Sequence, residues 1–152
     1  MKLTSQAFKH NQPMPRHYTC QGDNVSPPLE ISDVPEEAAS LALICDDPDA
    51  ATDPDGPGHT YDHWVLWNIP PKMTAIAENA SLQSADIGQN SSGENKYTGP
   101  CPPNGTHRYF FRLYALSTEL ELPDSAGAEE LEDALAGHVL ARSELIGTYQ
   151  KA

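Results

Sequence analysis

The spacing of proline and glycine is the feature that most constrains the fold of this chain. Its 152 residues include fourteen prolines and ten glycines, which divide the apolar sequence into short runs. Proline removes a backbone donor from a helix interior, and glycine weakens a helix through its conformational freedom. Short apolar runs bounded by such residues are typical of strands and turns. The sequence therefore predicts a mainly β domain and argues against a helical bundle.

Three apolar runs are expected to form the main strands, namely Ser40–Asp46, His63–Ile69 and His107–Leu116. The first is continuously apolar, so we expect it to be buried on both faces. Weaker strand candidates are Thr4–Phe8 and Leu29–Ile31, together with the stretches near Ile76 and Tyr97.

One helix is predicted near the C-terminus. The sequence 123–125, Pro-Asp-Ser, is a start signal, and Glu129 and Glu130 would occupy the first turn, where the helix dipole favours acidic side chains. Residues at helical spacing then follow, at Leu131, Leu135, Val139 and Arg142. We expect this helix to cover one side of a sheet.

Charge and hydropathy exclude several classes of partner. Nine basic and 22 acidic residues give a net charge of −13, which repels nucleic acid and anionic lipid surfaces. No run approaches the roughly 20 apolar residues that a spanning helix needs, and the N-terminus lacks the apolar region of a secretory signal. We expect a single cytoplasmic domain over residues 1–152, with no nucleic-acid partner and no stable membrane insertion.

The three cysteines, Cys20, Cys45 and Cys101, match neither a zinc-ligand spacing nor a CxxC motif. Their odd number and the absence of a signal favour free thiols in a reducing compartment. Cys45 lies within an apolar run and is expected to be a buried packing residue.

Strand alternation places polar residues at one end of each main strand. Successive side chains point to opposite faces, so each strand presents an apolar face that ends in a polar residue. The three expected faces are Leu41, Leu43, Cys45 and Asp47; His63, Val65 and Trp67; and His107, Tyr109, Phe111 and Leu113. If the three strands lie side by side, Asp47, His63 and the His107–Tyr109 pair can converge beside the adjoining loops.

The segment before the third strand, Gly99-Pro100-Cys101-Pro102-Pro103-Asn104-Gly105, is expected to be stiff. A stiff loop loses little entropy when a ligand orders it, so it suits the wall of a site. One of its X-Pro bonds is a candidate for the cis form. The polar segments 48–61 and 86–106 are long, and loops of that length in a compact domain are usually functional or disordered.

The sequences DPDA (47–50), DHWVLWNIP (62–70) and GPCPPNGTHRYFFRLYAL (99–116) resemble the phosphatidylethanolamine-binding protein family, in its shorter bacterial and archaeal branch. YTCQGDNVSPPLE (18–30) extends the resemblance, which spans nearly the whole chain. It implies a β-sandwich-like fold with a large antiparallel sheet, a smaller second sheet and peripheral helices. It also implies a small pocket for phosphate, acetate or phosphorylated head groups.

The resemblance implies a ligand-binding site without catalytic residues, metal or cofactor, formed by Asp47, Asp49, His63, Gly99, Pro102, His107 and Tyr109. The chemistry is consistent, because imidazole and phenol groups donate to phosphate oxygens. Asp47 or Asp49 would orient a histidine, or accept from the ammonium of an ethanolamine head group. We expect a non-enzymatic protein that binds a small phosphorylated or anionic ligand, and, from the bacterial-type relatives, a homodimer.

Two alternative functions stay open. A metal-dependent hydrolase would use Asp47, Asp49, His63 and His107 as ligands. A protein-interaction module that inhibits a protease or a kinase would use the loop 86–98 as its contact surface. A nucleophilic enzyme is disfavoured, because no GxSxG motif exists and proline flanks Cys101 on both sides.

Overall fold

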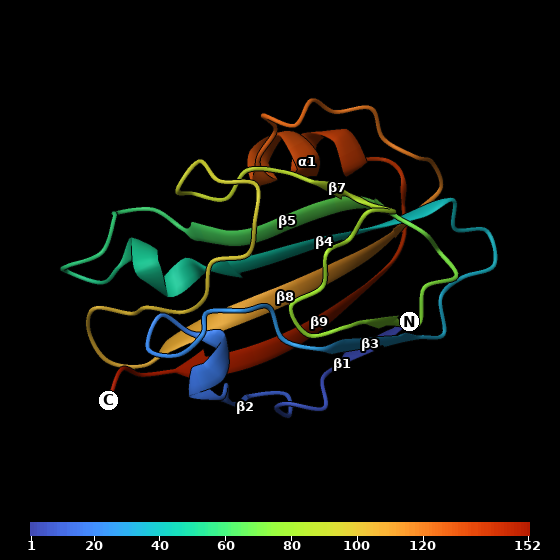
Figure 1. Ribbon diagram of the computed structural model, residues 1–152. Helices are drawn as coiled ribbons and strands as arrows, with labels where there is room; N and C mark the ends of the chain where they lie inside the picture. The colour runs from blue at the N-terminus through green and yellow to red at the C-terminus, as the bar shows by residue number, and fades with distance from the viewer.

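Two β-sheets organise the computed structural model, which describes all residues from Met1 to Ala152 (Figure 1). The large sheet has the strand order β2-β9-β8-β4-β5-β7 and the small sheet has the order β1-β3-β6. All neighbours are antiparallel except the short parallel pair of β2 and β9. The strands are β1 Lys2–Thr4, β2 Gln12–Pro13, β3 Leu29–Ser32, β4 Ser40–Asp47, β5 Tyr61–Ile69, β6 Ala75–Ile76, β7 Asp86–Ile87, β8 His107–Leu116 and β9 Val139–Tyr149, and the helices are η1 Arg16–Tyr18, η2 Pro48–Ala51 and α1 Ala128–Leu135. The predicted mainly β fold with two sheets is confirmed.

The three main predicted strands lie side by side, with β4 between β5 and β8. β8 has the predicted bounds, whereas β4 and β5 extend to Asp47 and Tyr61. All residues of β4 are buried, as its continuous apolar sequence predicts. This central position brings the C-terminal end of β4 next to the N-terminal ends of both neighbours.

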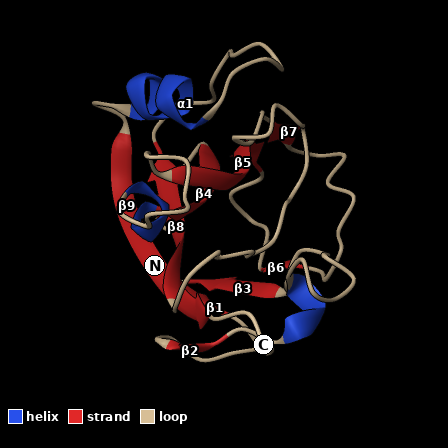
Figure 2. Ribbon diagram, turned by 90° about the vertical axis from the view of Figure 1, so that its left-hand side faces the viewer, coloured by secondary structure: helices blue, strands red, loops and turns tan.

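Apolar layers pack on both faces of the large sheet. Between the two sheets, Leu43 of β4 and Phe111 of β8 belong to one core cluster. On the opposite face, Leu131 and Leu135 of α1 pack into a second cluster with Trp67 and other sheet residues. Figure 2 shows α1 and the small sheet on opposite sides of the large sheet. The predicted role of the helix as a cover is therefore confirmed.

The helix itself is shorter than its periodicity predicts. It begins at Ala128 and ends at Leu135, and Gly137 then adopts a φ of 84°, a left-handed conformation that glycine tolerates. The expected helical positions Val139 and Arg142 lie instead on β9, which pairs with β8 along its length. At eight residues, α1 is the longest helix, and no helix has the length and hydropathy to cross a membrane.

The weaker strand predictions are partly confirmed. Leu29–Ile31 lies in β3 and Ile76 in β6, but β1 shares only Thr4 with the expected Thr4–Phe8 and no strand forms at Tyr97. Ser5 closes a turn in the first segment by accepting from the Ala7 amide. Tyr97 is buried through its side chain, whose hydroxyl donates to the Tyr18 carbonyl at 2.8 Å. A buried aromatic residue in a loop gives the same sequence signal as a buried aromatic residue in a strand, which explains the wrong prediction at Tyr97.

The prediction of three free thiols is wrong. Cys20 and Cys101 form a disulfide across 81 positions of sequence, and only Cys45 is free. The Cys20 amide also donates to the Pro100 carbonyl at 3.1 Å, so the backbone brings the two segments together. Cys45 is buried as predicted. The cysteines therefore no longer support a reducing compartment.

Candidate functional site

The polar ends of β4, β5 and β8 meet at one end of the large sheet, on the left of Figure 1. Around this end, the segments that follow β4 and precede β8 enclose a cavity of about 370 Å³. Its lining residues are Asp47, Ala50, Asp55, Gly56, Pro57, Tyr61, His63, Thr98, Gly99, Cys101, Pro102, Pro103 and His107. The volume lies within the range of small-molecule sites. The predicted convergence of the strand ends is confirmed.

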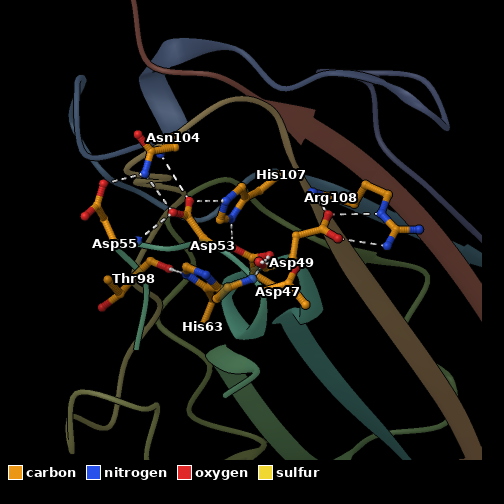
Figure 3. Close-up of polar contacts among 11 residues, drawn as sticks. Asp47, Asp49, Asp53, Asp55, His63, Thr98, Asn104, His107 and Arg108 are labelled. Atoms are coloured by element: carbon orange, nitrogen blue, oxygen red, sulfur yellow. Dashed lines mark hydrogen bonds and ion pairs between the residues drawn. The ribbon is translucent and has the colours of Figure 1, made fainter. Parts of the chain in front are cut away.

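His107 lies between two carboxylates, as Figure 3 shows. Its Nδ1 donates to Asp47 Oδ2 at 2.6 Å and its Nε2 donates to Asp53 Oδ2 at 2.8 Å. Because an ionised carboxylate only accepts, both ring nitrogens carry protons and the ring is an imidazolium. Burial lowers the pKa of His107, but the hydrogen bonds to Asp47 and Asp53 outweigh it and the net pKa is raised.

Asp47 orients the histidine from the end of β4. Burial raises the pKa of Asp47, and the hydrogen bond from His107 opposes that shift. Its second oxygen accepts from the Ala50 amide at 3.2 Å and so caps η2. Of the two aspartates expected to hold a histidine, Asp47 is therefore the one that does so.

Asp53 is a site residue that the sequence analysis missed. The backbone amide and side-chain amide of Asn104 donate to it at 3.1 and 2.8 Å, and the Asp55 amide donates at 3.0 Å. The hydrogen bond from the Asn104 side chain is the largest of the effects that lower the pKa of Asp53, to about 2. A sequence signal exists, because DPDG at 53–56 repeats the DPD of 47–49.

Asp49 does not line the cavity. It forms a two-point ion pair with Arg108, with Nε at 3.0 Å and Nη2 at 2.9 Å. The hydrogen bond from Arg108 is the first cause of a lowered pKa at Asp49. Arg108 and His107 are successive residues of β8, so their side chains point to opposite faces of the sheet. Asp49 pairs with Arg108 and therefore does not point into the cavity beside His107.

A β-bulge sets the direction of His63. In the pairing of β4 with β5, Cys45 lies opposite Trp64 and Asp46 opposite Asp62, so His63 is an extra residue. His63 packs against Tyr109, with ring centroids 5.3 Å apart. Val65 and Trp67 belong to the cluster under α1 instead. The expected shared face of His63, Val65 and Trp67 is therefore wrong.

His63 is a hydrogen-bond acceptor toward the site at neutral pH. Its Nδ1 donates to the Thr98 carbonyl at 2.6 Å, and its buried Nε2 has no partner. Burial lowers the pKa of His63 to about 4, and the positive charge of His107 acts in the same direction. The neutral ring with its proton on Nδ1 leaves a lone pair on Nε2.

Tyr109 packs against His63, which lines the cavity, but Tyr109 is fully buried and is not itself a lining residue. Its hydroxyl, like His63 Nε2, has no hydrogen-bond partner. Burial, followed by the charge of Asp47, raises the pKa of Tyr109 well above its usual value, so the hydroxyl stays protonated. His63 and Tyr109, whose ring centroids lie 5.3 Å apart, therefore leave one acceptor and one donor unpaired.

The segment Gly99–Pro103 forms a wall of the cavity. The Gly99 amide donates to Asn24 Oδ1 at 2.6 Å, and Cys101 is tied to Cys20. Pro102 lines the cavity as well. The chain has no cis peptide bond, so the candidate X-Pro bonds of this loop are all trans.

Replacing Gly99 by alanine is expected to destabilise the protein by roughly 1–3 kcal/mol. A Cβ at Gly99 would lie 2.1 Å from the Tyr18 carbonyl oxygen, a backbone atom that cannot rotate away. Gly127→Ala is the comparison variant, because its Cβ meets only an ordinary contact at 3.4 Å and it loses only the preference for glycine over alanine at the N-cap of α1. Urea unfolding measures both, and equal midpoints for the two variants would contradict the expectation.

The metal-dependent hydrolase has no geometric basis in this arrangement. No group of three or more His, Cys, Asp or Glu side chains is placed to hold a metal ion. Asp47 is hydrogen-bonded to His107, and Asp49 is hydrogen-bonded to Arg108. The expected ligands therefore do not fit a metal.

Comparison with known proteins agrees with the fold. The sequence matches the phosphatidylethanolamine-binding protein family over residues 4–150. A UPF0098 protein of Methanothermobacter thermautotrophicus is 49% identical over 99% of both chains. The crystal structure of a putative phosphatidylethanolamine-binding protein homologue from Chlamydia trachomatis has a TM-score of 0.91 and 44% identity, over 99% of this chain and 97% of that one. The crystal structure of YbcL from E. coli has a TM-score of 0.87 and 29% identity, over 99% of this chain and 98% of YbcL. The chain belongs to the phosphatidylethanolamine-binding protein family.

Proposed function

We propose that the protein binds a small phosphate-bearing or other anionic ligand in the cavity and does not transform it. The observation that carries this proposal is the pair of unpartnered buried atoms, His63 Nε2 and the Tyr109 hydroxyl. His63 lines the cavity together with the His107 imidazolium, and Tyr109 packs against His63. Buried polar atoms without partners are rare in native proteins. A singly protonated phosphate satisfies both, because its P–OH donates to His63 and a charged oxygen accepts from Tyr109.

Binding fits these groups better than catalysis does. In the ligand-free protein both nitrogens of His107 are hydrogen-bonded to carboxylates, so the ring has no free position there from which to move a proton. Cys101 is held in a disulfide and offers no thiolate nucleophile. Tyr109 keeps its proton at neutral pH because burial raises its pKa. These constraints support a pocket that holds a ligand through fixed donors and acceptors.

Replacing Tyr109 by phenylalanine is expected to weaken phosphate binding roughly tenfold without lowering the stability of the free protein. The substitution removes a hydroxyl that has no hydrogen-bond partner at ordinary distance and lies near the Asp47 carboxylate, so the free protein loses no well-formed hydrogen bond. The ligand, in contrast, loses a donor to a charged oxygen. Calorimetric titration with inorganic phosphate and with phosphoethanolamine measures the first effect, and urea unfolding measures the second.

His63→Ala should weaken the same titration, whereas His138→Ala should leave it unchanged because His138 is exposed and lies outside the cavity. Unchanged affinity in both Tyr109→Phe and His63→Ala would sink the proposal. Loss of affinity in the His138 variant as well would show that the titration reports a surface effect.

Three expectations from the sequence stay predictions: the homodimer, the cytoplasmic location and the alternative of a protease or kinase inhibitor. The loop expected to serve an inhibitor, residues 86–98, is closed on itself by the Asn90 side chain, which donates to the Lys96 carbonyl and to Thr98 Oγ1. Light scattering after size-exclusion chromatography measures the oligomeric state of the purified protein.

A further inference from the structure

The His107 imidazolium is the only cationic group among the residues that line the cavity, since none of them is lysine or arginine. An anion that enters the cavity has no other charged donor to bind. One N–H of this ring, on Nδ1, is committed to Asp47 at the end of β4. The N–H on Nε2 is therefore the charged donor that remains for a ligand.

That remaining donor already has a partner. Asp53 Oδ2 accepts from His107 Nε2 at 2.8 Å, and the Asp53 side chain is only 2% exposed. Figure 3 shows the Asp53 carboxylate against the ring on the side opposite Asp47. Asn104 holds it there through two hydrogen bonds. A carboxylate that is not itself part of the cavity lining thus occupies the acceptor position at Nε2 that a ligand oxygen would take.

The charge balance around the ring adds to this effect. Asp47 and Asp55 line the cavity and Asp53 contacts the ring, so three carboxylates surround one imidazolium. Asp55 differs from Asp53 in a useful way, because it lines the same cavity and accepts from the same Asn104 side chain but is not bonded to His107. Substitutions at the two residues therefore distinguish the effect of a nearby negative charge from the effect of an acceptor bonded directly to His107 Nε2.

We infer that Asp53 is a specificity-determining residue that acts as an internal anion and competes with the ligand for Nε2 of His107. This inference rests on the proposed anion-binding function. A ligand oxygen takes this hydrogen bond only when Asp53 gives it up, so weakly basic anions that cannot replace a carboxylate are excluded. Asn104 sets the strength of the competition, because it fixes the Asp53 carboxylate in place.

The test is a calorimetric titration of inorganic phosphate at pH 7 into the wild type, Asp53→Asn and Asp55→Asn. Asp53→Asn keeps an oxygen that can accept from Asn104 but removes the charged acceptor. We expect it to bind phosphate roughly tenfold more tightly than the wild type, the change that corresponds to one charge-assisted hydrogen bond. Asp55→Asn removes an equal charge from the same loop, and its gain in phosphate affinity should be clearly smaller.

A gain in Asp55→Asn equal to that in Asp53→Asn would overturn the inference, because it would reveal a simple charge effect. Wild-type binding that depends on Tyr109, without any gain in Asp53→Asn, would overturn the inference and leave the proposed function intact. The absence of phosphate binding in every variant would overturn both.

A measurement on the wild type keeps the inference testable if Asp53→Asn does not fold. Nitrogen-15 spectra of the His107 ring should show a shifted Nε2 proton when phosphate saturates the protein, because the partner of this proton changes. The Nδ1 proton, bonded to Asp47, should move less. Phosphate saturation with an unchanged Nε2 signal would contradict competition at this atom.

Discussion

Replacing both Cys20 and Cys101 by serine is expected to lower the free energy of unfolding by roughly 4–5 kcal/mol. The disulfide closes a loop between residues 81 positions apart, and a loop of this size restricts the unfolded chain strongly. The bond also joins the segment after η1 to the cavity wall. Because net stabilities of small domains are only about 5–15 kcal/mol, the loss is a large fraction of the total. Urea unfolding under oxidising conditions measures it.

Reducing agent provides the matched control for this prediction. Added dithiothreitol should shift the unfolding midpoint of the wild type toward that of the double serine variant, and it should leave the variant itself unchanged. Cys45 cannot account for a shift, because it is a buried thiol in both proteins. Equal midpoints for the oxidised and reduced wild type would contradict the prediction.

The strand ends of the site could be predicted because they follow from local periodicity. The apolar runs of β4, β5 and β8 set the strands, and alternation along β4 and β8 placed Asp47 and His107 on the face that meets in the structure. The same argument from alternation failed for His63. The bulge that turns it depends on the register against β4, which no pattern within β5 reveals.

The remaining errors share a physical cause, since each depends on contacts between distant segments. Asp53 meets His107 across 54 positions of sequence, and Cys20 meets Cys101 across 81. The family resemblance placed Asp49 in the pocket, yet Asp49 forms an ion pair with Arg108 and does not line the cavity. Spacing along the chain does not encode such pairings.

The C-terminal segment illustrates a conflict between two periodicities. Leu131, Leu135 and Val139 match a helical repeat, but the half-buried residues from Val139 onward also alternate as in a strand. β9 hydrogen-bonds to β8 along its length, and this pairing decides between the two patterns. Gly137 marks the change through its left-handed conformation.

Replacing His107 by alanine is expected to destabilise the protein by about 3 kcal/mol at neutral pH, because it leaves Asp47 as a buried carboxylate without its partner. The side chains of both residues are 5% exposed. We place the effect at the lower end of the range for broken buried ion pairs, since the adjoining cavity can admit water. His138→Ala, an exposed histidine, is the control and should unfold like the wild type.

The pH dependence of this difference distinguishes a lost ion pair from a lost packing contact. In the wild type the folded-state pKa of His107 is raised, so its stabilisation is complete below the unfolded pKa near 6.5 and is lost as the pH rises through the folded pKa. In His107→Ala, burial raises the pKa of Asp47 and only the Ala50 amide still opposes this shift. Protonation of Asp47 therefore reduces the loss of stability in the variant as the pH falls toward the unfolded pKa near 3.9. The gap in unfolding free energy should therefore be largest near pH 6 and should shrink both toward pH 4 and toward alkaline pH. A gap that stays constant across this range would mean that His107 stabilises the fold by packing alone, and the imidazolium between two carboxylates would not exist in solution.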